Sequence, residues 1–490
     1  MSAKINASPL ATIDHAHAGA DTETVAPPAM SQRWWVLAVV VAAQFMFVVD
    51  AFIVNVAIPS IQADLQASAG QIEAVIALYQ VAYASLVITG GRLGDILGRK
   101  RVFVSGVLAF TAASLWCGMA GSGAELVLAR LVQGAMAALM VPQVLATIHT
   151  LFPAAGRTRA FTVFGIALGL GGAAGFALGG LLVTLDVLGL GWRSVFLVNL
   201  PIGAAIALAA QRLMPRVARR PGTRLDLAGA AVLFLSLTCL IGPVMAGHQL
   251  GWPVWLWAVM AAGAVMLGLF PRLERTVERR SGLPLIDLAL LSDRKFLRGL
   301  RAAFSFHFGN VSFYLVMTFF TQNELRFSPL EGGLAVMPLA LAFTLASQLA
   351  GRWAVRGGIA VLLWGGMGQL AGIIALGGLA GIPAQPGTAA LTAALAMFGF
   401  GQGLVMAPLA GMVLATVQPA HAGSGAGLLN TIQQTAGAVG VSCVGAAYVL
   451  GGTADRRGVL AALALLGLST LATIVLLARM GQGRSAGRNL

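Results

Sequence analysis

Long apolar runs, each about as long as a membrane span, follow one another along almost the whole chain. A bilayer core about 30 Å thick needs roughly 20 apolar residues per helix, and run after run meets that length. Only 10% of the residues are charged and 58% are hydrophobic, whereas a soluble domain carries charge on roughly a quarter of its residues. The sequence therefore excludes a water-soluble globule and predicts an all-α integral membrane protein.

The apolar runs predict about fourteen transmembrane helices joined by short connectors. Their expected limits are 35–60, 72–90, 102–120, 124–147, 160–182, 195–212, 226–247, 253–271, 297–320, 331–350, 358–380, 387–413, 424–448 and 458–478. The polar segment 1–33 has the composition of a disordered tail and not of a cleaved signal peptide.

Basic residues are distributed unevenly among the connectors. If the N-terminus lies inside, 26 of the 31 Lys and Arg residues fall in tails or connectors on that side and four on the other. This asymmetry follows the positive-inside rule and predicts a multi-pass protein of the cytoplasmic (inner) membrane with both termini in the cytoplasm. The net charge of +14 therefore sets topology. We expect the lipid bilayer as a partner and no nucleic acid.

Patterns typical of cofactor or metal chemistry are missing from the sequence. The three cysteines lie in apolar runs, where a free cysteine behaves as a small hydrophobe, and the six histidines show no ligand spacing. No lysine belongs to a phosphate-binding loop, which argues against a pump driven by ATP. We expect no cofactor, no metal and no enzymatic activity. If the protein moves a solute across the membrane, an ion gradient drives this movement, or the solute simply equilibrates.

Two connectors that are eight spans apart are similar. GRLGDILG (91–98) follows the second span and GRWAVRGG (351–358) follows the tenth, and each of these spans begins with a capping box, SAGQ (68–71) or SPLE (328–331). This repeat predicts two six-helix halves with two helices inserted between them. The expected parts are a tail at 1–33, an N-terminal half at 34–213, a linker with the inserted helices and a basic cytoplasmic loop at 214–296, a C-terminal half at 297–479 and a tail at 480–490.

One carboxylate and one guanidinium lie well inside predicted spans. Asp50 belongs to FVVDAFIVNV (47–56), and Arg130 belongs to the fourth span. A charge at mid-bilayer costs roughly 2.5–3.5 kcal/mol on the insertion scale, so the two are expected to pair and to have a function. Desolvation favours a neutral carboxyl group, which can then bind and release a proton as its surroundings change. The alternatives are a permanently protonated acid bonded to Asn55 or a backbone carbonyl, and a purely structural ion pair.

Other acidic residues have simpler explanations. Glu73 and Glu331 lie in the first turns of predicted helices, where capping and the helix dipole account for them. Asp95 and Arg99 lie in the glycine-rich connector after the second span. We interpret this connector as a conformational latch at the cytoplasmic gate; the alternative is a solvated loop that only sets topology.

Polar residues on otherwise apolar helices are candidates for the lining of a central substrate cavity. Tyr79 and Tyr83 share one helix face and are the best pair, and His307 with Asn310 is the second. The full set is Asn55, Tyr79, Tyr83, Gln133, His307, Asn310, Tyr314, Gln402, Asn430 and Gln433. Each of them alone is more often an interhelical hydrogen bond than a ligand contact. Because the second half has no acid at mid-depth, we expect a lipophilic neutral or monocationic substrate.

Four motifs together resemble the major facilitator superfamily, and within it the fourteen-span drug:proton antiporters. The matching segments are GRLGDILGRKR (91–101), FVVDAFIVNVAIPSI (47–61), LARLVQGAMAALMVP (128–142) and GWRSVFLVNLPIG (191–203). The resemblance implies the major facilitator fold and a role in proton coupling for Asp50 and Arg130, with Gln133 one turn further on. From the glycine-rich turn itself, we expect gating roles for Gly91, Asp95, Gly98 and Arg99 of the loop.

The motif of the fifth helix departs from the family pattern. GGAAGFALGG (171–180) keeps the glycines but has Phe176 where the proline of a Gly-Pro pair is expected. Gly171, Gly175 and Gly179 still predict a close approach of helices, as small residues at spacings of four do, and we expect them to take part in gating. Without the proline, the choice between antiport and symport stays open.

These observations predict a monomeric, proton-coupled exporter of amphipathic organic compounds such as drugs, dyes and antibiotics, working by alternating access. The first alternative is a proton-coupled transporter for one natural metabolite, including self-resistance export of a secreted product. The second is a membrane receptor or scaffold that transports nothing. The embedded Asp50 and Arg130 argue against a scaffold, because they cost stability without an evident structural need.

Overall fold

The part of the chain that the structure describes is entirely helical. The structure is a computed structural model, and it describes residues 30–152, 154–215, 225–281, 288–382, 387–417, 422–452 and 456–485. Fourteen helical segments within these ranges are long and apolar enough to cross a membrane, which confirms the predicted number of spans. Most of the first predicted tail (1–29) and the last five residues of the second lie outside the described residues.

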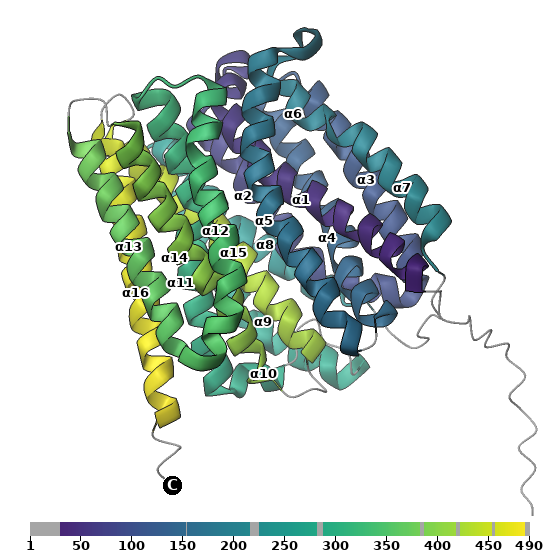
Figure 1. Cartoon of the computed structure of the whole chain (residues 1–490). Helices are drawn as coiled ribbons and strands as arrows, with labels where there is room; N and C mark the ends of the chain where they lie inside the picture. The colour runs from purple at the N-terminus through teal and green to yellow at the C-terminus, as the bar shows by residue number, and fades with distance from the viewer. Residues whose placement is uncertain are drawn as a thin grey trace, which may run out of the picture.

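The first six spans pack mainly against one another. They are built by α1 (Met30–Leu65), α2 (Ala69–Leu97), α3 (Arg99–Met119), α4 (Gly123–Leu151), α5 (Ala154–Leu185) and a segmented sixth span of η2 (Gly191–Arg193), α6 (Ser194–Leu197) and α7 (Asn199–Leu213). α4 packs against α2 and α3, α1 packs against α5, and α3 packs against α7. In Figure 1 this set forms the purple and blue side of the molecule.

Two further spans follow, α8 (Leu227–Leu250) and α9 (Val254–Ser281). They pack against each other, and α8 also packs against α2 and α15 (Ala422–Gly451). Trp255 and Trp257 on α9 are exposed, as expected for a helix that faces lipid. α8 therefore lies beside a boundary between early and late helices, and α9 lies outside it.

The last six spans form the green and yellow side in Figure 1. They follow the short helix α10 (Leu288–Ser292) and comprise α11 (Arg294–Thr318), which continues into the π-helical turn η3 (Phe319–Glu324), then α12 (Pro329–Gly357), α13 (Ile359–Gly381), α14 (Thr388–Leu414), α15 and α16 (Arg456–Ser485). α14 packs against α12 and α13, and α11 packs against α15 and α16.

The predicted capping boxes are present at both helix starts. Ser68 Oγ accepts a hydrogen bond from the Gln71 amide at 3.3 Å, and Gln71 Oε1 accepts one from the Ser68 amide at 2.9 Å. Ser328 and Glu331 form the same pair of bonds at 3.3 and 2.8 Å. Capping thus accounts for Glu331, as predicted.

The ends of the same two helices are also alike. Gly98 follows α2 with φ of 96°, and Gly358 follows α12 with φ of 53°. Both are the last glycine of the repeated connector, and both adopt a backbone conformation that side chains with a Cβ disfavour. α2 and α12 therefore begin with the same kind of cap and end at the same kind of glycine.

Two helix pairs make most of the contacts between the early spans and the late ones, α5 with α12 and α2 with α15. On α12, a Cβ at Gly333 would lie 2.4 Å from the carbonyl oxygen of Phe176. Between α2 and α15, Thr431 Oγ1 donates to the carbonyl of Ala84 at 3.0 Å. We call these two contacts the α5–α12 seam and the α2–α15 seam. The two described ends of the chain lie on one face of the molecule, which we call the termini face (Figure 1).

Candidate functional site

Asp50 on α1 and Arg130 on α4 form a buried ion pair. Arg130 Nη1 lies 2.7 Å from Asp50 Oδ2, and the two side chains are 1% and 0% exposed. Neither helix contains another charged side chain at this depth, so each charge is compensated mainly by the other. Removing one partner of such a pair leaves an uncompensated buried charge, which costs about 3–5 kcal/mol.

Polar side chains of three more positions complete the surroundings of Asp50. Gln133 Nε2 donates to Asp50 Oδ1 at 2.9 Å, and Asn199 Nδ2 donates to the same oxygen at 2.8 Å. Ser114 Oγ accepts from both amides, at 2.7 Å from Gln133 and 3.0 Å from Asn199. Every contact to Asp50 is a donor, so the arrangement is built for a carboxylate that accepts hydrogen bonds. We call Asp50, Arg130, Gln133, Asn199 and Ser114 the Asp50 network.

Arg130 is held from several sides as well. Its Nη1 donates to Gln133 Oε1 at 2.7 Å, and its Nε donates to the carbonyl of Val75 at 3.3 Å. The guanidinium carbon lies 4.0 Å from the centre of the Tyr79 ring, within the range of a cation–π contact. The Tyr79 hydroxyl is buried without a hydrogen-bond partner in the described part of the chain. Arg130 therefore keeps a carbonyl, an amide oxygen and a ring face as partners besides Asp50.

α5 comes unusually close to the turn of α1 that carries Asp50. A Cβ at Gly175 would lie 2.8 Å from Phe52 Cβ, one at Gly179 would lie 2.9 Å from the Ile53 carbonyl oxygen, and one at Gly171 would lie 3.0 Å from a Val48 methyl group. The three glycines therefore form the flat surface on which α1 rests.

Phe176, at the position of the expected proline, fills the space between the two sides of the molecule. α5 remains a continuous helix there. The Phe176 ring lies 5.5 Å from the ring of Phe52 and 5.2 Å from the ring of Tyr314 on α11. Phe52 is two residues from Asp50, so it projects from another side of α1. Asp50 thus points into the early helices and Phe52 contacts the late ones.

Four of the residues predicted to line a cavity form hydrogen bonds with one another in pairs. Tyr83 accepts from Asn430 Nδ2 at 3.2 Å across the α2–α15 seam. The Tyr314 hydroxyl accepts from Gln402 Nε2 at 3.2 Å. These pairs fit the alternative of interhelical hydrogen bonds: the first joins α2 to α15, and the second joins α11 to α14.

The remaining candidates form no bond to another helix in the described part of the chain. Asn55 donates to the carbonyls of Ala51 and Phe52 on its own helix at 3.1 and 3.2 Å, and His307 Nδ1 lies 2.9 Å from the carbonyl of Ala303. Asn310 Nδ2 is buried without a partner among the described residues, and Gln433 is partly exposed. The two pockets described in the structure lie elsewhere.

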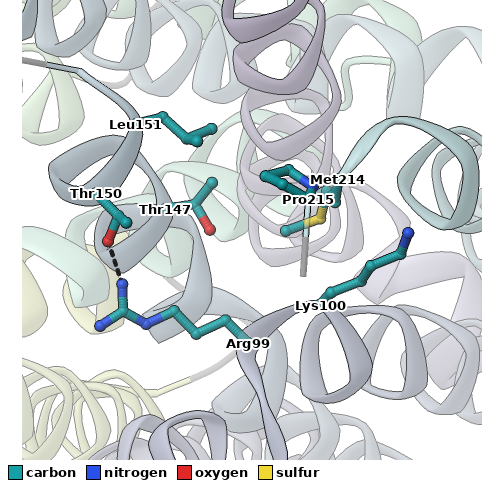
Figure 2. A pocket seen from close by; sticks show the side chains of 7 residues that line it. All are labelled: Arg99, Lys100, Thr147, Thr150, Leu151, Met214 and Pro215. Carbon is teal, nitrogen blue, oxygen red and sulfur yellow. Dashed lines mark hydrogen bonds between the residues drawn. The ribbon is translucent and has the colours of Figure 1, made fainter. Parts of the chain in front are cut away.

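The connector predicted to act as a latch joins the ends of α2, α3 and α4. Arg99 Nη2 lies 3.3 Å from Asp95 Oδ1, and Arg99 Nη1 donates to the Ala146 carbonyl at 3.0 Å and to the Thr150 hydroxyl (Figure 2). Gly91 lies against Pro142 of α4: a Cβ added at Gly91 would lie 3.6 Å from the Cβ of Pro142. A small pocket on the termini face is lined by Arg99, Lys100, Thr147, Thr150, Leu151, Met214 and Pro215.

Sequence reasoning missed Asn199, Ser114 and the environment of Glu73. Asn199 lies in the motif segment 191–203, and an amide in an apolar helix is a sequence signal for a buried polar contact. Ser114 has no such signal, because serine is common in apolar helices. The expectation that capping explains Glu73 is wrong, because Gln71 forms the cap and Glu73 is 4% exposed on another side of α2.

The sequence pattern of the Major Facilitator Superfamily matches residues 40–236 and 224–441. The chain belongs to the Major Facilitator Superfamily, which confirms the resemblance inferred from the four motifs. This family consists of membrane transporters, so the chain is a multi-pass transporter and not an enzyme.

Two similar proteins come from Streptomyces species. One is described as a probable actinorhodin transporter of Streptomyces coelicolor; it is 37% identical over 454 residues, which are 91% of this chain and 77% of that protein. The other is the puromycin resistance protein pur8 of Streptomyces alboniger, 36% identical over 418 residues, which are 84% of this chain and 81% of that protein. The crystal structure of the human organic anion transporter MFSD10 (TETRAN) has the same fold, with a TM-score of 0.59, 18% identity and coverage of 90% of this chain and 99% of that one.

Proposed function

We propose that the protein is a proton-coupled exporter of amphipathic organic compounds, working as a monomer in the cytoplasmic membrane with both termini in the cytoplasm. Transport proceeds by alternating access, in which the α5–α12 and α2–α15 seams part on one face at a time. The observation that carries the proposal is the Asp50 network, a titratable acid fully enclosed by donors inside a membrane transporter. Similarity to proteins described as a transporter of actinorhodin and a puromycin resistance protein supports export of drugs or antibiotics.

The coupling step is an exchange of partners at Asp50. With Asp50 ionised, Arg130, Gln133 and Asn199 hold α1 against α4 and α7. A proton on the carboxyl group removes the attraction for Arg130 and replaces one acceptor by a donor. The guanidinium then rests on the Tyr79 ring and the Val75 carbonyl that it already contacts. Protonation therefore loosens α1 from its neighbours.

α1 carries this change to the boundary between the two sides. Phe52, half a turn from Asp50, contacts Phe176 on α5 and Tyr314 on α11 through ring distances of 5.5 and 4.8 Å. A shift of α1 must therefore repack this aromatic cluster, because side chains at close-packed interfaces move between discrete arrangements. We assign the substrate site to the region between Tyr83–Asn430 and Tyr314–Gln402, whose hydrogen bonds exchange for bonds to substrate when the seams part.

The free energy released when one proton enters the cell is large enough to drive export of one substrate molecule against its gradient. A proton moving down 100 mV releases about 2.3 kcal/mol, and each unit of pH difference adds about 1.4 kcal/mol. Together they support a substrate gradient of several hundredfold for one proton per substrate.

A second candidate is dedicated export of one natural product, including self-resistance of a producing cell. It is favoured by the probable actinorhodin transporter, which matches 91% of this chain. The two candidates differ in substrate range and not in coupling. Export assays with unrelated dyes and antibiotics decide between them: efflux of several unrelated compounds supports the broad exporter, and efflux of one chemical family supports the dedicated one.

The proposal is tested in proteoliposomes with an imposed pH gradient. Wild-type protein is expected to accumulate substrate against its gradient, and Asp50→Asn is expected to lose this uphill transport while it still exchanges substrate. Asp64→Asn is the matched control, because Asp64 pairs with Arg193 at a partly exposed position. Equal uphill transport by wild type and Asp50→Asn would remove Asp50 from the coupling mechanism.

A further inference from the structure

Glu73 is a buried carboxylic acid outside the Asp50 network. It lies in the second turn of α2, towards the face opposite the termini, and is 4% exposed. Its Oε2 atom has no hydrogen-bond partner in the described part of the chain. The acid faces a small pocket lined by Ala69, Gly70 and Glu73 of α2, Val244 and Met245 of α8, and Ala446 and Val449 of α15.

The α2–α15 seam is shaped to accommodate this side chain. Gly445 on α15 lies directly opposite, and a Cβ there would come within 2.4 Å of Glu73 Oε1. Two turns along α2, Gln80 is placed in the same way: a Cβ at Gly437 would come within 2.3 Å of Gln80 Oε1, which also lacks a partner among the described residues. Polar groups of α2 thus enter spaces left open by glycines of α15.

Among the residues whose side chains the structure describes, no cation forms an ion pair with Glu73. α8 contributes Val244 and Met245, and α15 contributes Ala446, Val449 and the thiol of Cys443, which is the described titratable group that interacts electrostatically with Glu73. Arg130 on α4 is bonded to Asp50, Gln133 and the Val75 carbonyl, and it forms no ion pair with Glu73. An ionised carboxylate in this apolar setting is strongly disfavoured, and the neutral acid is the form compatible with a closed seam.

We propose that Glu73 is a second proton-binding site, and that its protonation permits the α2–α15 seam to close on the face opposite the termini. This inference rests on the proposed transport cycle only in requiring that the seam opens on that face. When the seam parts, water reaches the carboxyl group, which releases its proton to the same side. When the seam closes again, the proton is taken back from that side.

Glu73 therefore differs in role from Asp50. Because it binds and releases its proton on one side, it moves no charge across the membrane and leaves the number of protons per substrate unchanged. Its effect is on the balance between closed and open states. One proton bound on closing changes the closed-to-open ratio by up to about tenfold per pH unit, with closure favoured at low pH.

The test measures this balance directly, without substrate. Spin labels are placed at Ala63→Cys, an exposed position at the end of α1, and Leu450→Cys, which is 68% exposed at the end of α15, with the native Cys117, Cys239 and Cys443 replaced by alanine. The distribution of distances between the two spin labels is recorded by double electron–electron resonance between pH 5 and 8. The protein with native Glu73 is expected to shift towards the short distance as pH falls, and Glu73→Gln, which resembles the neutral acid, is expected to keep the short distance throughout.

Two further variants separate this proposal from the proposed function. Glu324→Gln, a partly exposed acid near the same face, is expected to keep the full pH response. Asp50→Asn is expected to retain the part of the response that Glu73→Gln removes. An unchanged pH response in Glu73→Gln overturns the inference, and so does a response that only Asp50→Asn abolishes, whereas loss of uphill transport in Asp50→Asn bears on the proposed function alone.

Discussion

Asp50 accepts hydrogen bonds from Gln133 and Asn199 besides its ion pair with Arg130. These contacts stabilise the ionised carboxylate in different ways. Arg130 supplies charge, whereas Gln133 and Asn199 supply neutral donors that also fix Ser114. Hydrogen bonds to a charged acceptor contribute about 1.5–3 kcal/mol, more than bonds between neutral groups. The stability of this part of the protein therefore depends on donors that carry no charge themselves.

Asn199→Leu removes one of these donors at similar volume. We expect a loss of about 1.5–3 kcal/mol in stability, because Asp50 Oδ1 loses a donor in a buried setting. Thermal unfolding in detergent measures the effect. Asn430→Leu, which breaks a bond between neutral groups, is the control and should cost about 0.5–1.5 kcal/mol. Equal losses in the two variants would show that the charge on Asp50 contributes nothing.

The ion pair itself is tested by removing one or both partners. Arg130→Met leaves the carboxylate buried alone and should destabilise the protein by about 3–5 kcal/mol. Asp50→Leu together with Arg130→Met removes both charges and should recover most of that loss without restoring uphill transport. Recovery of both stability and transport in the double variant would support a purely structural pair.

At the scale of helices, small residues determine where close approach occurs. α5 rests on α1 through Gly171, Gly175 and Gly179, which lie at spacings of four on one side of the helix. This contact supports the turn of α1 that carries Asp50. α5 is continuous through Phe176, so the packing of α1 on α5 relies on the glycines and on aromatic rings.

Gly175→Ala tests this contact. The added Cβ would lie 2.8 Å from Phe52 Cβ and 3.0 Å from the Val49 carbonyl oxygen, and neither atom can move without a shift of the backbone. We expect a loss of about 1–3 kcal/mol from overpacking, measured by thermal unfolding. Gly165→Ala on the same helix meets nothing within 4 Å and should be neutral or slightly stabilising. A neutral Gly175→Ala would mean that α1 and α5 adapt easily.

α2 among the early spans and α12 among the late spans begin and end in the same way. Capping boxes begin α2 and α12, and positive φ glycines follow both. Gly98→Ala and Gly358→Ala force a Cβ into a left-handed conformation and should each cost about 1–2 kcal/mol. Gly251, which has φ of 68° after α8, should respond similarly. No destabilisation at either position would indicate that these connectors rearrange freely.

At the scale of the whole molecule, the sequence predicted what depends on single segments. Apolar length determined the fourteen spans, and local hydrogen-bond chemistry determined the capping boxes around Ser68 and Ser328. The approach of Asp50 to Arg130 was expected because two buried opposite charges at similar depth have few other partners. These features follow from the cost of exposing polar groups to hydrocarbon.

Features that depend on which helices meet could not be predicted in the same way. Asn199 and Ser114 join the Asp50 network only because α3 and α7 pack together beside α1. Glu73 looked like a first-turn acid, and its burial results from the contact of α2 with α8 and α15. In the sequence, Phe176 is only a departure from the family motif. The fold shows that its ring lies between Phe52 of α1 and Tyr314 of α11. A single sequence contains no direct record of these pairings.

The central claim is that one proton moves on and off Asp50 in each transport cycle. The most direct measurement is proton flux in proteoliposomes that hold a pH-sensitive dye and start without a pH difference, after an outward or inward substrate gradient is imposed. The account predicts that wild-type protein moves protons in response to substrate and that Asp50→Asn passes substrate down its gradient with no proton movement. Substrate-driven proton flux in Asp50→Asn equal to that of the wild type would contradict it.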